Sequence, residues 1–121
     1  MISEDKTYNI SGRCMDVYNN LGAGFLEIVY KDALELEFKK NNIPFEREKK
    51  YEINYNGIIL PHHFYADFVV YQSLILEIKC VSMLSKEHYA QCINYLKVSN
   101  NKLSLLVNFG ESSLKYKRII L

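Results

Sequence analysis

The sequence lacks the signals that would place it in a membrane or outside the cell. Its 121 residues contain no run near the roughly 18 apolar residues that span a bilayer. The first ten residues hold two acids and no apolar stretch, so we do not expect a secretory signal. The three cysteines, Cys14, Cys80 and Cys92, are odd in number and have no CxxC spacing. This pattern argues against a disulfide framework or a zinc site and predicts a reduced, cytoplasmic protein.

The chain also has little net charge. A formal charge of +1 gives no strong electrostatic case for nucleic acid, so any basic surface must be local. The contents of 49% hydrophobic and 24% charged residues are those of a soluble globular protein. With no internal repeat, low-complexity segment or linker, residues 1–121 are expected to form one domain.

Residues 67–79 form the stretch around which the chain is organised. Two runs of β-forming residues flank a polar break, which predicts a hairpin centred near Gln72. Asp67 then lies opposite Glu77, and alternation puts Glu77 and Lys79 on one face. Like charges directly opposite destabilise a sheet by up to about 1 kcal/mol, so the pair makes physical sense if a cation fills the gap. Two hard oxygen ligands with room for water suit Mg²⁺ or Mn²⁺.

Two helices are predicted before this hairpin, over residues 5–20 and 25–40, separated by a glycine-containing turn. Glu27 points along the apolar stripe of the second helix and would complement the helix dipole, unless it has a role in a site. The stripe is formed by Leu26, Val29, Tyr30, Ala33, Leu34, Leu36 and Phe38. The charged residues expected mostly outside are Lys31, Asp32, Glu35, Lys39 and Lys40.

A strand over residues 45–55, a turn at Asn56-Gly57 and a return over residues 58–60 precede the hairpin. Pro61 is expected to interrupt the pairing. Together these strands predict a three-stranded antiparallel meander. His62 and His63 are adjacent and point to opposite faces, so a polar role at the strand edge is favoured over shared metal ligation.

A third helix is predicted over residues 86–98, with Ser85 as its N-cap. Gln91 and Tyr95 are four residues apart and therefore lie on one face of it. This spacing fits a core tyrosine with a neighbouring glutamine as well as a functional pair.

Residues 103–109 are almost continuously apolar, which suits a central or parallel strand. Residues 115–121 form a last strand with a basic character. It is either a solvated basic end or a source of phosphate contacts from Lys115, Lys117 and Arg118.

The order of charged residues resembles a known signature. Asp67, followed by Glu77 and Lys79 in an ExK triplet, resembles the D…(D/E)xK motif of the PD-(D/E)XK nuclease superfamily. Gln91 and Tyr95 match the QxxxY pattern that follows this motif in the RecB-type and lambda-exonuclease-like branch. The match has the same order and the same kinds of element.

A second resemblance lies in the helix that carries Glu27. Gly24, Glu27 and Tyr30 match GxxExxY, the motif of a small bacterial and archaeal family assigned to the same superfamily. The resemblance covers nearly the whole chain. It implies an α/β restriction-endonuclease-like core, a mixed sheet whose three-stranded antiparallel meander is flanked by helices.

The resemblance also implies a Mg²⁺- or Mn²⁺-dependent nuclease that hydrolyses phosphodiester bonds, in DNA above other nucleic acids. Lys79 would orient or deprotonate the attacking water, or stabilise the phosphorane. The other implied site residues are Asp67, Glu77 and the backbone carbonyl of Ile78 as metal ligands, Glu27 as a further ligand or holder of a second ion, and Gln91, Tyr95 and Tyr30 as groups that position the substrate.

The main alternative is a nucleic-acid-binding or regulatory protein that keeps the nuclease scaffold without significant turnover. A purely structural module is less favoured, because it leaves the opposed carboxylates unexplained. No second domain for target recognition is visible in the sequence. Specificity would therefore come from loops, from a homodimer partner or from another protein.

Overall fold

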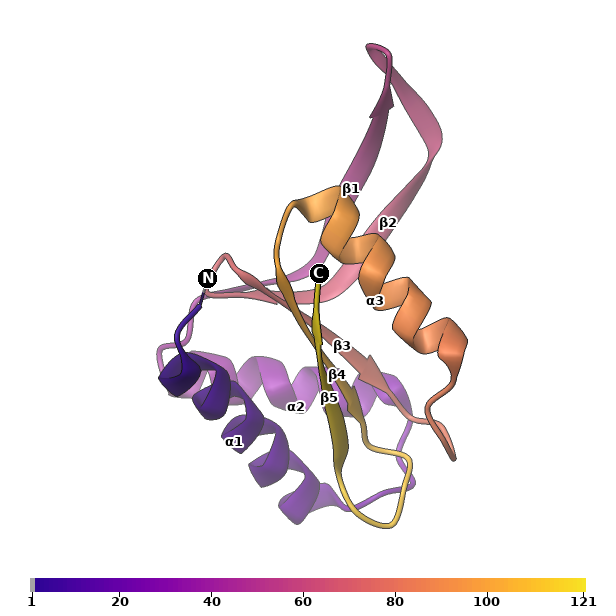
Figure 1. The fold of residues 1–121 in the computed structure, drawn as a ribbon. Helices are drawn as coiled ribbons and strands as arrows, with labels where there is room; N and C mark the ends of the chain where they lie inside the picture. The colour runs from indigo at the N-terminus through magenta and orange to yellow at the C-terminus, as the bar shows by residue number, and fades with distance from the viewer. Residues whose placement is uncertain (1) are drawn as a thin grey trace.

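The computed structural model describes residues 2–121 as one mixed sheet with helices on both faces (Figure 1). The strands lie in the order β1-β2-β3-β4-β5. No helix among the described residues is long and apolar enough to cross a membrane. The elements are α1 (Glu4–Leu21), α2 (Glu27–Lys40), β1 (Phe45–Tyr55), β2 (Ile58–Val70), β3 (Leu74–Lys79), α3 (Lys86–Ser99), β4 (Leu103–Asn108) and β5 (Lys115–Ile120).

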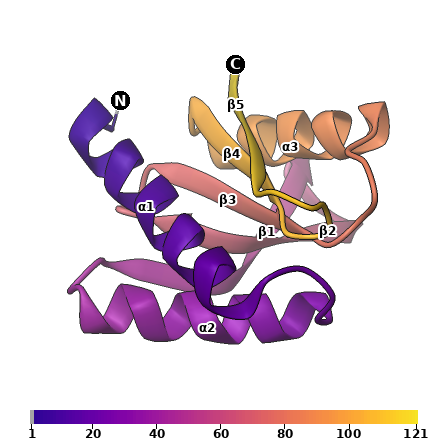
Figure 2. The same cartoon turned by 90° about the horizontal axis from the view of Figure 1, so that it is seen from below.

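Each face of the sheet has its own apolar core. Helices α1 and α2 cover one face and α3 covers the other (Figure 2). Alternation along β3 divides its side chains between the two cores: Leu76 and Ile78 pack toward α1 and α2, and Ile75 packs toward α3. Glu77 and Lys79 follow the same alternation as Ile75, so their side chains belong to the α3 face.

The predicted meander is present, with β1, β2 and β3 antiparallel in sequence order. The hairpin between β2 and β3 has the predicted centre, because Val70 pairs with Leu74. Its turn residues Tyr71 and Gln72 both have left-handed backbone angles, with φ of 54° and 59°. Strand β4 pairs parallel to β3 and is buried throughout, as its apolar sequence predicted.

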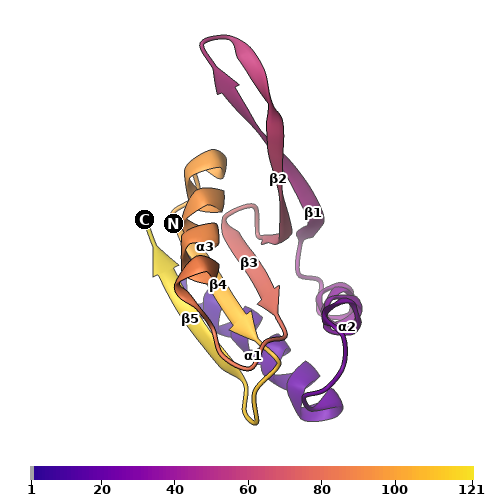
Figure 3. The ribbon, with the colours of Figure 1, turned by 90° about the vertical axis from the view of Figure 1, so that its right-hand side faces the viewer.

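The distal parts of β1 and β2 leave the body of the protein as a two-stranded arm (Figure 3). Pro61 was expected to interrupt the pairing, and this is confirmed: residues 60–62 of β2 have no partner on β1, where the register shifts between Glu52 and Asn54. His62 packs its ring near Phe64. The ring of His63 packs near Tyr65 instead, so the two histidine rings do not meet at one site.

Helix α2 differs from its predicted pattern of burial. Tyr30, Leu34 and Phe38, spaced four residues apart, are completely buried and form a narrow stripe. Leu36 was placed in that stripe and is 68% exposed, and Leu26, the residue before the helix, is also exposed. Lys31 was expected outside and is only 7% exposed, because it turns toward acids on β1 and β2.

Candidate active site

Asp67 on β2 and Glu77 on β3 lie where the two strands separate. The antiparallel ladder runs from Val70 to Phe68. Beyond it, side chains bond to the backbone: Oε2 of Glu77 accepts the N–H of Asp67, and Oδ2 of Asp67 accepts the N–H of Ile78, both at 2.8 Å. Hydrogen bonds to ionised carboxylates are stronger than neutral ones, so each acid is held in a fixed orientation.

Lys31 extends from α2 and places its positive charge beside Asp67. Its Nζ lies 2.8 Å from Oδ1 of Asp67 and also donates to Oε1 of Glu48 on β1. Asp67 therefore has one oxygen on a lysine and the other on the backbone of β3. The Glu48 side chain is 47% exposed, so the lysine joins a buried acid to one that faces water.

The backbone of β1 is irregular at Glu48, the position that faces Asp67. Its neighbours Arg47 and Lys49 pair with β2 in register, while Glu48 itself has φ of 53°. A left-handed conformation is uncommon for a residue other than glycine and costs of order 1–3 kcal/mol. The surrounding structure holds Glu48 in this conformation, with its carboxylate on Lys31.

The acids carry more negative charge than the nearby lysines neutralise. Burial, and after it the charge of Asp67, raise the pKa of Glu77 to about 8. Glu27, the first residue of α2, is half-buried, and its pKa is raised by burial and then by the charge of Asp67. Lys79 and Lys31 lower both pKa values but do not reverse the shifts.

The QxxxY pair connects α3 to the two strands that carry the acids. Lys79 is the last residue of β3, and its Nζ donates to Oε1 of Gln91 at 2.9 Å. Tyr95, one helical turn later, donates its hydroxyl to the backbone carbonyl of Tyr65 at 2.8 Å. Gln91 thus fixes the ammonium of Lys79, and Tyr95 fixes β2 two residues before Asp67.

Tyr30 lies in the core. Its ring is fully buried and stacks on Phe109, with ring centroids 4.5 Å apart. Its hydroxyl donates to the carbonyl of Gly22 at 2.5 Å and accepts from the N–H of Phe25 at 3.2 Å. Tyr30 therefore anchors the turn that leads into Glu27. Any effect of Tyr30 on a substrate would act through this turn and not by contact.

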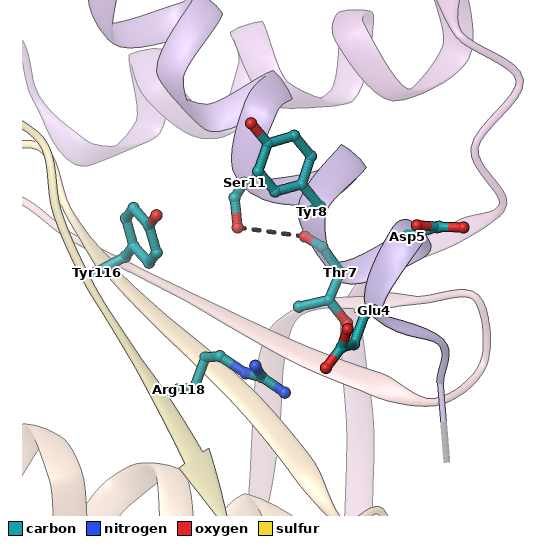
Figure 4. Close-up of a pocket in the computed structure, with 7 residues that line it drawn as sticks. All are labelled: Glu4, Asp5, Thr7, Tyr8, Ser11, Tyr116 and Arg118. Atoms are coloured by element: carbon teal, nitrogen blue, oxygen red, sulfur yellow. Dashed lines mark hydrogen bonds between the residues drawn. The ribbon is translucent and has the colours of Figure 1, made fainter.

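The three basic candidates on β5 do not share a face. Lys115 and Lys117 lie on the same side of β5 as Ile119, which packs toward α3. Arg118 and Tyr116 point the other way and line a pocket of about 430 Å³ between α1 and β5 (Figure 4). Strand β4 lies between β5 and β3, and the register places Lys117 in line with Glu77 through Leu106 of β4.

The donor set fits a hard divalent cation. Glu77 uses Oε2 for the backbone, which leaves Oε1 for a ligand. The carbonyl of Ile78 faces the same gap as its N–H, because both groups of an extended residue point the same way. Within residues 2–121 no three His, Cys, Asp or Glu side chains are grouped closely enough to hold an ion by themselves. The rest of a coordination shell would come from water and substrate.

Sequence reasoning missed Lys31 and Glu48. A signal for Lys31 was available, since it is four residues after Glu27 and therefore on a helix face already assigned to the interior. Glu48 gave no signal. The sequence pattern around Glu48 predicts a regular strand, whereas its backbone conformation depends on the packing of α2 and β2 beside it.

The comparisons with known proteins agree with this fold. The family model of the PD-(D/E)XK nuclease superfamily matches residues 4–119. Among solved structures, the chain is similar to "Crystal structure of SSO0001", with a TM-score of 0.61 and 23% identity, over 76% of this chain and 48% of that one. The chain thus spans about half the length of that structure, and the similarity supports the expected restriction-endonuclease-like fold. No curated protein matches the chain.

Proposed function

Because the chain belongs to the PD-(D/E)XK nuclease superfamily, we propose that it is a nuclease that hydrolyses phosphodiester bonds in DNA with Mg²⁺ or Mn²⁺. Nuclease activity is the general property of the superfamily. The metal, the DNA substrate and the roles of single residues are proposals specific to this chain. The GxxExxY family is proposed as its subfamily, on the motif formed by Gly24, Glu27 and Tyr30.

The observation that carries this proposal is the reciprocal bonding of Asp67 and Glu77 to each other's strands. Two buried acids side by side are costly unless a cation compensates them. The raised pKa of Glu77 is the sign of this cost. The orientation of each acid by a backbone N–H supports the proposal of a divalent ion at this site.

In the proposed mechanism, Asp67, Glu77 and the carbonyl of Ile78 hold the ion, and Glu27 completes its shell through water or helps to hold a second ion. When bound, the ion polarises a phosphoryl oxygen and lowers the pKa of bound water. Lys79, fixed by Gln91, orients or deprotonates the attacking water or stabilises the charge of the phosphorane.

Contacts to the phosphate backbone are proposed for the basic residues of β5. Lys115 and Lys117 are exposed on the α3 face of the sheet, the face to which Lys79 also belongs. Arg118 would contact a phosphate only along the opposite face, over α1. Target specificity would come from loops, from a homodimer partner or from another protein.

The test is a cleavage assay on single-stranded, duplex and branched DNA and on RNA, with Mg²⁺, with Mn²⁺ and with a chelator. We expect metal-dependent cleavage by the wild type and none by Asp67→Asn. Arg13→Gln, which lies on α1 away from the acids, is the matched control and should cut like the wild type. Cleavage that persists in the chelator, or in Asp67→Asn at the wild-type rate, would refute the proposal.

A binding scaffold without turnover is the second candidate, and Lys31 favours it. The ammonium of Lys31 already compensates Asp67 without any metal. An acid that is already compensated by a lysine can serve structure or nucleic-acid binding alone. Wild-type protein that binds DNA but never cuts it with either metal would support this candidate over the nuclease.

A further inference from the structure

Lys31 lies on the oxygen that a metal ion would need. Of the four carboxylate oxygens of Asp67 and Glu77, one of each pair accepts a backbone N–H. Of the two that remain, Oδ1 of Asp67 has the ammonium of Lys31 at 2.8 Å. A divalent ion bound between the two acids would therefore meet a positive charge already in place.

We propose that Lys31 is an exchangeable counter-ion and a positioning residue. It neutralises Asp67 in the metal-free protein and is held by Glu48 alone when a divalent ion takes Oδ1 of Asp67. This inference rests on the proposed function, because it describes the regulation of the same metal site. Lys31 touches neither substrate nor reacting atoms in it.

The two acceptors of Lys31 differ in a way that suits such an exchange. Asp67 is buried, whereas nearly half of the Glu48 side chain is exposed. A buried lysine with a single charged partner could not leave that partner without a large free-energy cost, because its charge would then be buried and unpaired. Glu48 removes this obstacle, since Lys31 keeps one ion pair after it leaves Asp67. The long flexible stem of lysine allows a small movement of the ammonium without any change in α2.

The irregular backbone of β1 supports the same interpretation. Glu48 has φ of 53° between two residues that pair regularly with β2. A regular strand at this position would place the side chain by simple alternation with its neighbours. The observed conformation gives the Glu48 carboxylate to Lys31 instead, at the one position of β1 that faces Asp67.

Competition between the ammonium and the metal has a measurable consequence. The metal must displace Lys31 from Oδ1, so the affinity of the wild type is lower than the two acids alone would give. The coupling is reciprocal: whatever holds Lys31 on Asp67 weakens metal binding, and whatever draws it toward Glu48 strengthens metal binding. Substitutions of Lys31 and Glu48 should therefore change metal affinity in opposite directions.

The experiment is isothermal titration calorimetry of Mn²⁺ into the full chain, without nucleic acid. We expect Lys31→Met to bind Mn²⁺ at least tenfold more tightly than the wild type. Glu48→Gln should bind it at least threefold more weakly, because Lys31 then has only Asp67 as a charged partner. Lys39→Met makes the same charge change on an exposed part of α2 and should leave the affinity unchanged.

The double variant Lys31→Met with Glu48→Gln separates this role from direct ligation by Glu48. If Glu48 acts only through Lys31, the double variant binds Mn²⁺ as tightly as Lys31→Met. A clear further loss of affinity in the double variant would make Glu48 a ligand and overturn the proposal. An affinity for Lys31→Met equal to that of the wild type would make Lys31 merely structural and would overturn it as well.

Asp67→Asn distinguishes failure of this inference from failure of the proposed function. If neither the wild type nor Lys31→Met binds Mn²⁺, the metal site and the exchange are both refuted. If the wild type binds, Asp67→Asn does not, and Lys31→Met equals the wild type, the exchange alone is refuted.

If Lys31→Met does not fold, Lys31→Gln keeps a polar group of similar length and carries the same expectation. The wild type offers an independent measurement, the ¹⁵N-resolved ammonium resonance of Lys31 during a titration with Mg²⁺. The resonance is identified by its absence in Lys31→Gln. We expect it to shift in step with metal binding, and a resonance that stays unchanged at saturation would overturn the exchange.

Discussion

The acids around Asp67 and the pocket between α1 and β5 both gather acidic and basic side chains, but the fold holds them differently. In the pocket of about 430 Å³, Glu4 and Asp5 lie on the exposed first turn of α1, and Arg118 points from β5 toward Glu4 (Figure 4). At Asp67 the carboxylates bond to backbone groups and to a buried lysine.

This difference shows why a hollow surface is a poor guide to function in this molecule. Exposed charges in a pocket are solvated and screened, so a fold can carry them at almost no cost and for no purpose. Buried charges are retained only where bonds compensate them, and Glu77, at 2% exposed, keeps a raised pKa even so. The candidate site is therefore marked by the cost of its charges and not by its volume.

The largest expected difference between the two regions is in catalysis. Lys79→Ala should lower single-turnover cleavage about a hundredfold to ten-thousandfold, the usual worth of a general acid–base group. Arg118→Ala, in the pocket, should change the cleavage rate at saturating DNA by less than about twofold. The measurement is single-turnover cleavage with Mg²⁺ or Mn²⁺. Equal losses in the two variants would break the comparison.

DNA binding should show the reverse order. Lys79→Ala removes at most one phosphate contact, so its affinity and its salt dependence should stay close to those of the wild type. Lys117→Ala should weaken binding and reduce the slope of affinity against salt by about one contact. A binding titration at two salt concentrations, run on the same samples, checks that the loss of cleavage by Lys79→Ala is not a loss of substrate.

Much of the fold was predictable because local signals and tertiary structure agree. The centre of the hairpin near Gln72 followed from two β-forming runs, and the parallel strand β4 followed from its uninterrupted apolar sequence. The boundaries of α2 were also close. The prediction of its buried face was less accurate. Leu36 was assigned to that face because it is apolar, but one residue per turn is enough to fill the contact of the helix with the sheet.

The partners of the acids were harder to predict than the acids. The pairing of Asp67 with Glu77 follows from strand geometry, which a sequence encodes through its period of two. Lys31 and Glu48 come from a different helix and a different strand. Their meeting depends on how α2 packs beside β1, and no local pattern encodes that distance. Lys31 supplies part of the positive charge that the sequence led us to expect beside the two acids.

The next largest effect concerns stability without metal. Repulsion between Asp67 and Glu77 alone would make Asp67→Asn neutral or stabilising, but Asp67 also forms an ion pair with the buried ammonium of Lys31. The loss of the Lys31 ion pair should therefore dominate. We expect Asp67→Asn to destabilise the fold by about 2 kcal/mol, less than the roughly 3–5 kcal/mol of a fully buried pair, because Glu48 still holds Lys31.

Urea denaturation with a chelator at pH 7 measures this change. Asp5→Asn in the pocket is the control and should cost less than about 1 kcal/mol, the usual worth of an acid in a first helical turn. A cost for Asp67→Asn no larger than that of Asp5→Asn would show that the Lys31 pair contributes nothing to stability.

A smaller effect is the pH dependence of stability that Glu77 causes. Its folded pKa of about 8 lies above the ordinary value of 4.5, so the folded state binds more protons than the unfolded state between these values. The stability that the raised pKa of Glu77 contributes is fully present below about pH 4.5, and it is lost as the pH rises through about 8. The slope is at most about 1.4 kcal/mol per pH unit for one proton. Glu77→Gln should flatten the curve, and an equally steep curve in that variant would assign the protons elsewhere.

The smallest expected difference is in the stability that two tyrosine hydroxyl groups contribute, one beside each region. Tyr95 is buried and donates its hydroxyl to the carbonyl of Tyr65, two residues before Asp67. Burial also raises the pKa of Tyr95, so the hydroxyl keeps its proton and remains a donor.

We expect Tyr95→Phe to destabilise the protein by about 1 kcal/mol, because a buried acceptor loses its bond. Tyr116→Phe in the half-exposed wall of the pocket should change stability by less than about 0.5 kcal/mol, since water replaces whatever its hydroxyl contacts. Thermal and urea unfolding of both variants decide the matter, and equal changes would mean that the tie between α3 and β2 does not depend on this hydrogen bond.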